Sequence, residues 1–266
     1  MTTPAPITSR RNPVVARFRE AASSGTVSAL MLLEGEHLVE EALRAGIPIA
    51  AVAATPAALA IPGSSDLLER AQRGGAEAFR VAESVMAALS PVRTPSGIVA
   101  LASRPRATTD DALQRQPSLV VCAVDVQDPG NVGAIVRASE AGGATGVLLA
   151  GACADPFSWK ALRGSMGSAL RLVVAAAPLD EAVDAARARG LKVLATVPRG
   201  GRTPYEVDLR APCLLLVGGE GPGLAEGVVR GADDRITIPM RPPVESLNVA
   251  VAAALLVYEA SRQRAR

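Results

Sequence analysis

The chain has 266 residues, which is enough for one large domain or two of ordinary size. Hydrophobic residues make up 49% and charged residues 20% of it, so a folded protein is expected rather than a disordered one. No run of about 18 apolar residues is free of charges and turn signals, and no apolar core of a secretion signal follows the N-terminal arginines. We therefore expect a cytoplasmic protein with no membrane span.

The cysteines bear on redox state and metal binding, and the basic residues bear on possible partners. Cys122, Cys153 and Cys213 are scattered without metal-ligand spacing, which indicates reduced thiols and no metal site. The formal net charge is only +2, but among the 28 basic residues only Lys160 and Lys192 are lysines. Arginine presents a planar fork of donors that suits phosphate. A GC-rich genome is an equally good explanation of the arginine excess.

A polar stretch, Arg104–Asp111, separates two apolar regions. We place a domain boundary there, between a first domain of residues 1–107 and a second of residues 108–266. In the first domain, helices are expected near residues 13–22, 35–45, 65–73 and 82–89, and strands near residues 27–33, 49–54 and 97–102. This pattern predicts a small α/β domain.

The second domain has a clearer alternation. Ser118–Asp125 is a continuous apolar run that ends in an acid, as in a buried parallel strand, and Asn131–Ala141 has helical spacing. Further strands are expected at Thr145–Leu149, Leu170–Val174, Leu191–Val197, Cys213–Val217 and Arg235–Ile238, and helices near residues 179–189 and at Leu247–Gln263. Strands that alternate with helices predict a mostly parallel sheet covered on both faces.

A first polar cluster, Asp125–Arg137, follows the first strand of this domain and starts a helix at Asn131. The free N–H groups of a helix start suit an anion such as phosphate. Arg137 is six positions after Asn131, which is not one face of an ideal helix unless Asn131 caps it and reaches forward. An ordinary capped helix with a solvated arginine would have the same pattern.

A second cluster, Val217–Leu224, has four glycines within six positions, directly after an apolar strand. Glycine lets a ligand lie against bare backbone, and Glu220 is the one acid in this segment. A flexible loop between a strand and a helix is the alternative.

A third cluster, Ile236–Asn248, runs through prolines into the last helix, with Ser246 placed to cap it and Asn248 in its first turn. An ordinary capped helix fits this segment too. All three clusters fall at the C-terminal ends of predicted strands, where α/β sheets bind ligands. We therefore predict that they form one site.

Other site chemistries are disfavoured. No P-loop sequence occurs, and the glycines follow a late strand rather than the first strand of a dinucleotide-binding domain. His37, the only histidine, lies in the first domain and is interpreted as structural. Chemistry in the second domain must therefore depend on Asn, Arg, Glu and Ser side chains, without a histidine.

Together the three clusters resemble the SpoU (TrmH) family of RNA 2′-O-ribose methyltransferases, in the SPOUT superfamily. The similar segments are Asp128–Ala141, Leu216–Leu224, Ile238–Met240 with Ser246–Ala252, and a further recurrent segment, Lys160–Ser168. The first domain is similar to the family's substrate-binding extension, through Met31–Ala42 and Thr94–Ala100. The resemblance implies an α/β fold: a C-terminal SPOUT domain with a trefoil knot and a smaller, N-terminal L30e-like α/β domain.

The resemblance also implies a cofactor and a set of site residues. The cofactor is S-adenosyl-L-methionine, held by backbone and apolar groups of Thr196, Gly218, Gly219, Gly223, Ile238, Met240 and Leu247. The expected catalytic residues are Asn131, Arg137, Glu220, Ser246 and Asn248. Arg137 is assigned to the phosphate and 2′-hydroxyl of the target nucleotide, with Asn131 and either Ser246 or Asn248 orienting Arg137 and the ribose, and with Glu220 holding the arginine or a substrate group. Glycine stands at position 219, where asparagine is frequent in the family.

The implied partners are RNA and a second copy of the chain. The extra first domain favours 23S rRNA over tRNA, and the apolar helix Leu247–Val257 offers a dimer interface, although a buried core helix would look the same. A non-catalytic RNA-binding protein that retains the fold is the alternative from another functional class.

Overall fold

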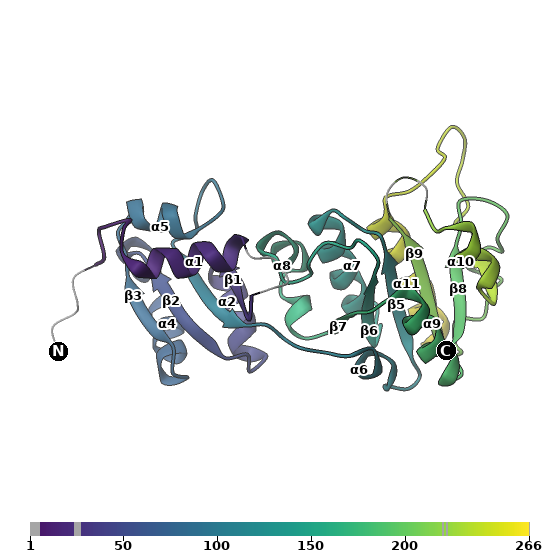
Figure 1. Cartoon of the computed structure of the whole chain (residues 1–266), viewed down its shortest axis with the longest axis horizontal. Helices are drawn as coiled ribbons and strands as arrows, with labels where there is room; N and C mark the ends of the chain where they lie inside the picture. The colour runs from purple at the N-terminus through teal and green to yellow at the C-terminus, as the bar shows by residue number, and fades with distance from the viewer. Residues whose placement is uncertain (1–5, 24–27, 220, 222, 266) are drawn as a thin grey trace. The chain divides into compact units, whose positions relative to one another are not determined.

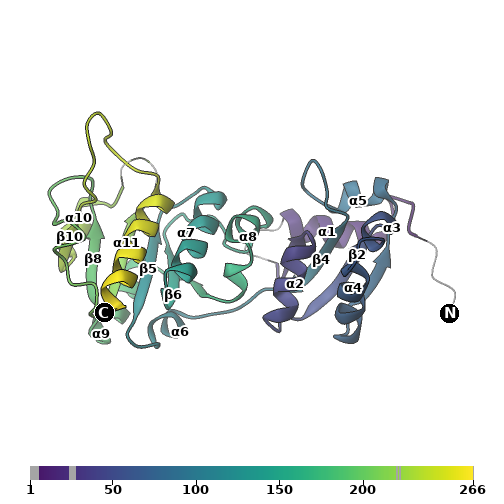
Figure 2. The same ribbon diagram turned by 180° about the vertical axis from the view of Figure 1, so that it is seen from behind.

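The computed structural model describes residues 6–23, 28–219, 221 and 223–265. The chain divides into two compact units (Figures 1 and 2). Unit 1 extends to Pro105 and also contains Phe157–Arg171; unit 2 comprises Arg106–Pro156 and Leu172–Arg266.

Unit 1 is built on a four-stranded sheet of order β1-β4-β2-β3. The strands are β1 Leu30–Glu34, β4 Ile98–Ser103, β2 Ile49–Ala54 and β3 Glu77–Arg80. β4 pairs antiparallel with β1 and β2, and β2 pairs parallel with β3. β3 was not predicted, because this short edge strand is only partly buried and lacks an apolar run.

Helices cover both faces of this sheet (Figures 1 and 2). On one face lie α1 Pro13–Ser23 and α5 Glu83–Leu89, whose apolar side chains join those of the strands in one core. On the other face lie α2 Glu36–Arg44 and α4 Ser64–Arg73, with the short helix α3 Pro56–Leu59 beside them. Phe18 of α1 is fully buried in the first of these cores.

The segment Phe157–Arg171 packs with unit 1, although the boundary at residue 107 placed it in the second domain. It holds α8 Trp159–Ser165 and the 3-10 turn η2 Ser168–Leu170, neither of which was predicted. α8 packs on β1, and Trp159 contacts the core around Phe18. The buried carboxylate of Glu34 accepts a hydrogen bond from Arg163 Nη1 at 3.2 Å. This segment therefore belongs to unit 1 because of its packing, although in chain order it lies within the second predicted domain.

Unit 2 contains a six-stranded sheet of order β10-β8-β9-β5-β6-β7, in which every neighbouring pair is parallel. The strands are β5 Leu119–Val124, β6 Gly146–Ala150, β7 Val173–Ala176, β8 Lys192–Thr196, β9 Cys213–Gly218 and β10 Asp234–Ile236. Every residue of β5 and β6 is buried, as expected for central parallel strands covered on both faces. The α/β class predicted from the sequence is confirmed, and the knot stays a prediction.

Two helix layers cover the sheet of unit 2. On one face, α6 Thr109–Leu113, α9 Leu179–Ala188 and α10 Glu226–Gly231 contribute to an aliphatic core. α7 Pro129–Ala141 and α11 Val249–Arg264 pack against each other (Figure 2). Gly142 ends α7 at this contact, and a Cβ atom there would lie 2.4 Å from Val257 Cγ1. The glycine therefore allows the close approach of α11.

All three cysteines are free thiols. Burial raises the pKa of Cys122 to about 12 and that of Cys213 to about 11, so neither is a thiolate at neutral pH. In the described part of the chain, no helix is both long and apolar enough to cross a membrane.

Phe18 offers a test of the unit 1 core. Phe18→Ala is expected to lower the free energy of unfolding of unit 1 by about 3–5 kcal/mol, because it leaves a cavity under α1. The sole tryptophan, Trp159, contacts this core, so urea unfolding followed by its fluorescence reports on unit 1. The exposed control Gln72→Ala should change that energy by less than about 0.5 kcal/mol. A loss below about 1 kcal/mol for Phe18→Ala would contradict this account of the core.

Candidate active site and cofactor pocket

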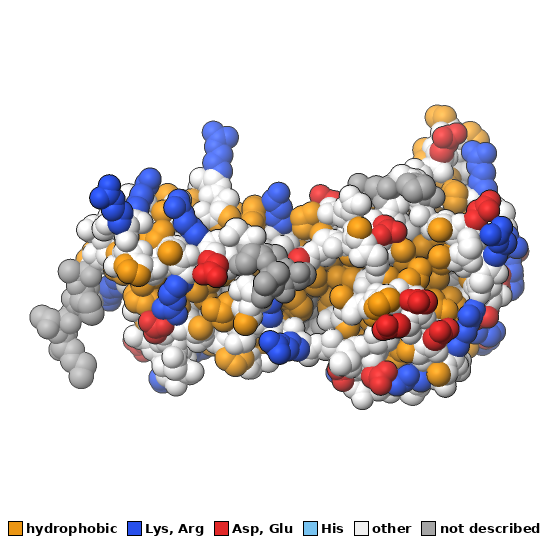
Figure 3. Space-filling model, in the orientation of Figure 1, with side chains coloured by type: hydrophobic (Ala, Val, Ile, Leu, Met, Phe, Trp, Pro, Cys, Tyr) orange, Lys and Arg blue, Asp and Glu red, His pale blue; other side chains and the backbone are white. Residues whose placement is uncertain are grey.

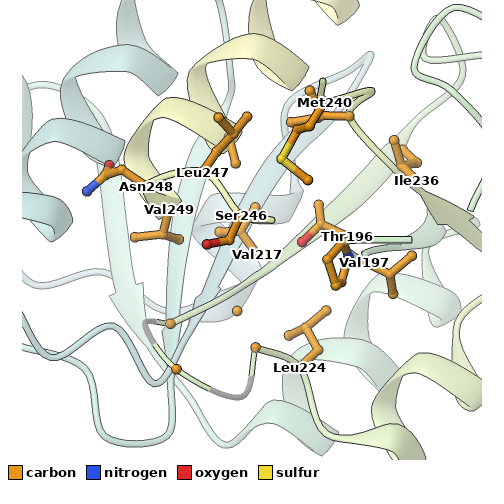
Figure 4. A pocket seen from close by; sticks show the side chains of 17 residues that line it. Thr196, Val197, Val217, Leu224, Ile236, Met240, Ser246, Leu247, Asn248 and Val249 are labelled. Carbon is orange, nitrogen blue, oxygen red and sulfur yellow. The ribbon is translucent and has the colours of Figure 1, made fainter. Parts of the chain in front are cut away.

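A pocket of about 390 Å³ lies at the carboxyl ends of β8, β9 and β10 in unit 2 (Figure 4). Its lining comes from four segments, because parallel strands bring the loops that follow them to one edge of the sheet. The lining residues are Thr196, Val197, Pro198, Val217, Gly218, Gly219, Gly221, Gly223, Leu224, Ile236, Ile238, Met240, Ser246, Leu247, Asn248, Val249 and Ala252.

The glycine loop after β9 forms one wall through its backbone. A Cβ atom on Gly218 would lie 2.6 Å from the backbone of Gly223 and Leu224, and one on Gly219 would lie 2.0 Å from the carbonyl oxygen of Asp125. Gly219 N–H donates to the carbonyl oxygen of Val124 at 2.7 Å, which fixes this approach. Glycine at position 219 is therefore required by the packing of the loop against the end of β5.

A second wall follows β8 and β10. Thr237 joins the two loops, because its hydroxyl donates to the carbonyl oxygen of Val197 and accepts from Gly201 N–H at 2.9 Å. Val197 N–H donates to the carbonyl oxygen of Ile236 at 2.9 Å. These bonds hold Thr196 and Met240 beside the cavity (Figure 4).

The start of α11 forms the third wall, and here the predicted cap is wrong. Asn248, rather than Ser246, caps the helix: its Oδ1 accepts from Ala250 N–H at 2.9 Å and Val251 N–H at 3.3 Å. The helix therefore begins at Val249 instead of Leu247. Ser246 is left free of the cap, and its hydroxyl points into the pocket, whereas the amide of Asn248 points away from the centre (Figure 4).

The cap of α7 also differs from the prediction. Asp128 accepts from Asn131 N–H at 2.9 Å, so α7 begins at Pro129 and Asn131 lies inside its first turn. The side chain of Asn131 instead accepts a hydrogen bond from Asn248 Nδ2 at 3.0 Å. This contact joins the first and third clusters, which are separated by more than one hundred residues in the sequence.

Arg137 does not belong to the described lining of the pocket of its own chain. It is exposed on α7, and six helical residues place it about 120° around the helix from Asn131. Asn131 and Gly142 face α11, so Arg137 lies on the neighbouring solvent face. Glu220, the remaining expected catalytic residue, lies outside the described residues.

The expected site residues are thus largely brought together. All seven expected cofactor-binding residues line the pocket, as do Ser246 and Asn248. Several apolar lining residues were not predicted as site residues, among them Leu224, Val249 and Ala252. All three lie inside the segments Leu216–Leu224 and Ser246–Ala252, so membership in these segments was the available signal.

The turn after β5 packs against the glycine loop, because Gly219 lies beside the backbone of Asp125. Asp125 has φ +56°, and its Oδ1 accepts from Ala152 N–H at 2.8 Å. Cys153 is half-buried beside it, and burial raises the pKa of its thiol. Among the residues that the structure describes, no three His, Cys, Asp or Glu side chains gather into a group that could hold a metal ion.

Two family models match the chain. The model of the SpoU rRNA Methylase family matches residues 118–258, and that of the MRM3-like substrate binding domain matches residues 26–100. The first match covers α7, the glycine loop and most of α11, and the second covers β1 to the middle of β4.

Relatives and solved structures agree with these matches. The 23S rRNA (guanosine(2553)-2′-O)-methyltransferase RlmP of Bacillus subtilis is 34% identical over 88% of this chain and 89% of its own length. An AdoMet-bound rRNA methyltransferase from Sinorhizobium meliloti has a TM-score of 0.88 at 28% identity, covering 97% of both chains. The SpoU methyltransferase AviRb from Streptomyces viridochromogenes, in complex with AdoMet, has a TM-score of 0.85 at 28% identity and covers 96% and 99%. With its glycine pocket, its paired helices and these matches, the chain belongs to the SpoU rRNA methylase family.

Proposed function

We propose that this protein transfers a methyl group from S-adenosylmethionine to a ribose 2′-hydroxyl of RNA, and that the RNA is 23S rRNA. The proposal rests mainly on one pocket, which is lined by residues of the second and third clusters and joined to the first cluster by the hydrogen bond between Asn131 and Asn248. RlmP, a 23S rRNA 2′-O-methyltransferase, is similar over nearly the whole chain. The match of unit 1 to a substrate binding domain supports a role in holding that RNA.

The pocket fits the cofactor in size and chemistry. Its volume of about 390 Å³ is within the range of sites for small ligands. Leu224, Val249 and Ala252 offer apolar cover for an adenine, and the glycine backbone leaves room for direct contact with the ligand. When bound, S-adenosylmethionine supplies a methyl group already activated for displacement by its sulfonium.

We assign binding of the methyl acceptor, the ribose 2′-hydroxyl, to the polar residues at the opening of the pocket. Ser246 directs a hydroxyl into the pocket, and the Asn131–Asn248 pair holds the starts of α7 and α11 together. Arg137 would stabilise the negative charge that develops on the 2′-oxygen and bind the neighbouring phosphate. A guanidinium resists deprotonation, so we assign Arg137 to charge stabilisation rather than to removal of the proton. Glu220 is proposed to hold the arginine or a substrate group.

The position of Arg137 favours a site shared between two copies of the chain. Val251, Leu255 and Tyr258 form an apolar stripe on α11, at 48%, 48% and 53% exposure. They are spaced four and three residues apart, which places them on one helix face. Exposed apolar stripes mark interfaces. Tyr258, at one end of this stripe, lies beside Gly142 at the end of α7, the helix that carries Arg137. We therefore propose a homodimer in which Arg137 serves the pocket of the partner copy.

The place of action follows from the substrate. A protein that modifies ribosomal RNA acts where ribosomes are assembled, so we propose a cytoplasmic location. Methylation of tRNA is the second candidate, because other relatives are described as tRNA/rRNA methyltransferases.

Methyl mapping tests the substrate. Comparison of 2′-O-methylation in RNA from a wild-type and a deletion strain should show the loss of a methyl group in 23S rRNA. Loss of a methyl group in tRNA alone would replace 23S rRNA by tRNA as the substrate. No loss in either RNA, with no binding of S-adenosylmethionine in calorimetry, would leave a non-catalytic RNA-binding protein.

Arg137→Ala tests the catalytic assignment. Loss of this donor is expected to raise the methyl-transfer barrier by about 2–4 kcal/mol, roughly a 30- to 1000-fold fall in kcat. The affinity for S-adenosylmethionine should stay unchanged in calorimetry, because Arg137 is assigned to the ribose and phosphate of the RNA rather than to the cofactor. The control Arg230→Ala, on exposed α10, should retain full activity. Undiminished activity of Arg137→Ala would remove this residue from the chemistry.

Leu255→Arg tests the dimer. The charge placed in the α11 stripe should shift the protein from dimer to monomer in analytical ultracentrifugation and abolish methyl transfer, because the shared site is lost. Ile61→Arg is the matched control, since Ile61 is also an aliphatic side chain, 53% exposed, but in unit 1. A Leu255→Arg protein that remains an active dimer would overturn the α11 interface.

A further inference from the structure

The N-terminal segment of unit 1 is rich in arginine and lies outside both family matches, which begin at residues 26 and 118. Its described part, residues 6–23, contains Arg10, Arg11, Arg17 and Arg19, and its only acid is Glu20. Arg17 is paired with Glu77 at 2.8 Å. The other three arginines have no ion pair with any carboxylate that the structure describes.

This segment is firmly held, so its arginines have defined positions. Ile7 forms a parallel bridge with Val81 beyond the end of β3, donating to the carbonyl oxygen of Arg80 at 2.8 Å. Val15 and Phe18 of α1 are buried against α5. The segment is therefore part of the folded unit and not a loose arm.

Two of the arginines are fixed on the backbone of α5. Arg10 Nε donates to the carbonyl oxygen of Ser84 at 2.8 Å, and Arg19 Nε donates to that of Ala88 at 3.2 Å. Ser84 and Ala88 are one helical turn apart, so the two guanidinium groups follow the same edge of α5. Because only Nε is used in these bonds, the Nη groups of each remain available for a ligand.

Arg93 continues the series in the loop between α5 and β4, where it is exposed and makes no ion pair with a described carboxylate. Figure 3 shows Lys and Arg side chains gathered along the edge formed by α1, α5 and this loop. We call Arg10, Arg11, Arg19 and Arg93 the arginine ridge. All four side chains are exposed.

The ridge is suited to phosphates rather than to bases. Guanidinium groups bind phosphate oxygens through paired donors. Phe18 is the only aromatic residue in segments 6–23 and 83–97, and it is buried, so these two segments offer no ring to stack on an unpaired base. A double-helical RNA segment, which presents its phosphates on the outside and its bases stacked, is the partner that fits this surface.

We propose that the arginine ridge binds the phosphate backbone of a double-helical segment of the substrate RNA, independently of base sequence. The inference rests on the proposed function, because it takes RNA as the substrate. It assigns binding of the RNA backbone to the α1–α5 edge of unit 1, whereas the methyl-transfer pocket belongs to unit 2.

The test is the salt dependence of RNA binding. Fluorescence anisotropy with a labelled RNA hairpin of arbitrary sequence, at several KCl concentrations, gives the slope of log K against log salt. For wild type, each phosphate contact contributes about 0.9 to this slope. Arg11→Gln with Arg93→Gln removes two exposed side chains that make no hydrogen bond or ion pair within the described part of the chain, so folding is not at risk. This pair should reduce the slope by about 2 and weaken binding roughly 60-fold at about 0.1 M salt.

Two further variants extend the test: one removes the whole ridge and the other is a matched control. A quadruple Arg→Gln variant of the ridge should lower the slope by about 4. Arg44→Gln with Arg73→Gln, on the opposite face of the same sheet, makes the same charge change and should leave the slope unaltered. Equal slopes for wild type, the double and the quadruple variant would overturn the ridge.

Methyl transfer to a 23S rRNA transcript separates this proposal from the proposed function. The ridge variants should raise KM for the transcript with little change in kcat. A wild-type protein that binds the hairpin through the ridge but transfers no methyl group would refute the proposed function and leave the ridge standing. A protein that methylates the transcript with a slope insensitive to the ridge would do the reverse.

Discussion

The close packing of bare backbone at the end of β9 is the constraint on which the pocket depends. Gly218 lies against the backbone of Gly223 and Leu224, and Gly219 lies against the carbonyl oxygen of Asp125. No side chain fits between these segments, so the loop folds back tightly and leaves a cavity lined by backbone. Thr237 joins the loops after β8 and β10, which form another wall of the pocket. These loops lie at the same edge of the sheet because the strands are parallel.

The pairing of α7 with α11 connects this cavity to the polar residues. Gly142 allows the close approach of the helices at one end, and the hydrogen bond between Asn131 and Asn248 joins their other ends. Because Asp128 and Asn248 supply the helix caps, the side chains of Asn131 and Ser246 are released for other contacts. Arg137 is exposed on α7 and lies outside the described lining of the pocket, which is why a second copy of the chain enters the proposed site.

The two units have different kinds of surface. Unit 2 offers a glycine pocket and an apolar helix stripe, features of cofactor binding and of self-association. Unit 1 carries arginines whose side chains are hydrogen-bonded to the backbone of α5. It also contains the segment Phe157–Arg171, which lies between β6 and β7 in the sequence. We propose that unit 1 binds the RNA backbone and that unit 2 carries out methyl transfer.

The α/β class, most strands of both sheets and the three clusters could be predicted from the sequence, because apolar runs and glycine turns are local signals. Nine of the residues that line the pocket could also be predicted, through a resemblance carried by those clusters. Contacts between distant segments set the other features. The caps at Asp128 and Asn248, the edge strand β3 and the membership of α8 in unit 1 depend on contacts between residues far apart in the chain. The exposed position of Arg137 on α7, outside the described lining of the pocket, was decided in the same way, because helix phase places a residue on a free face only once the neighbouring helix is in place.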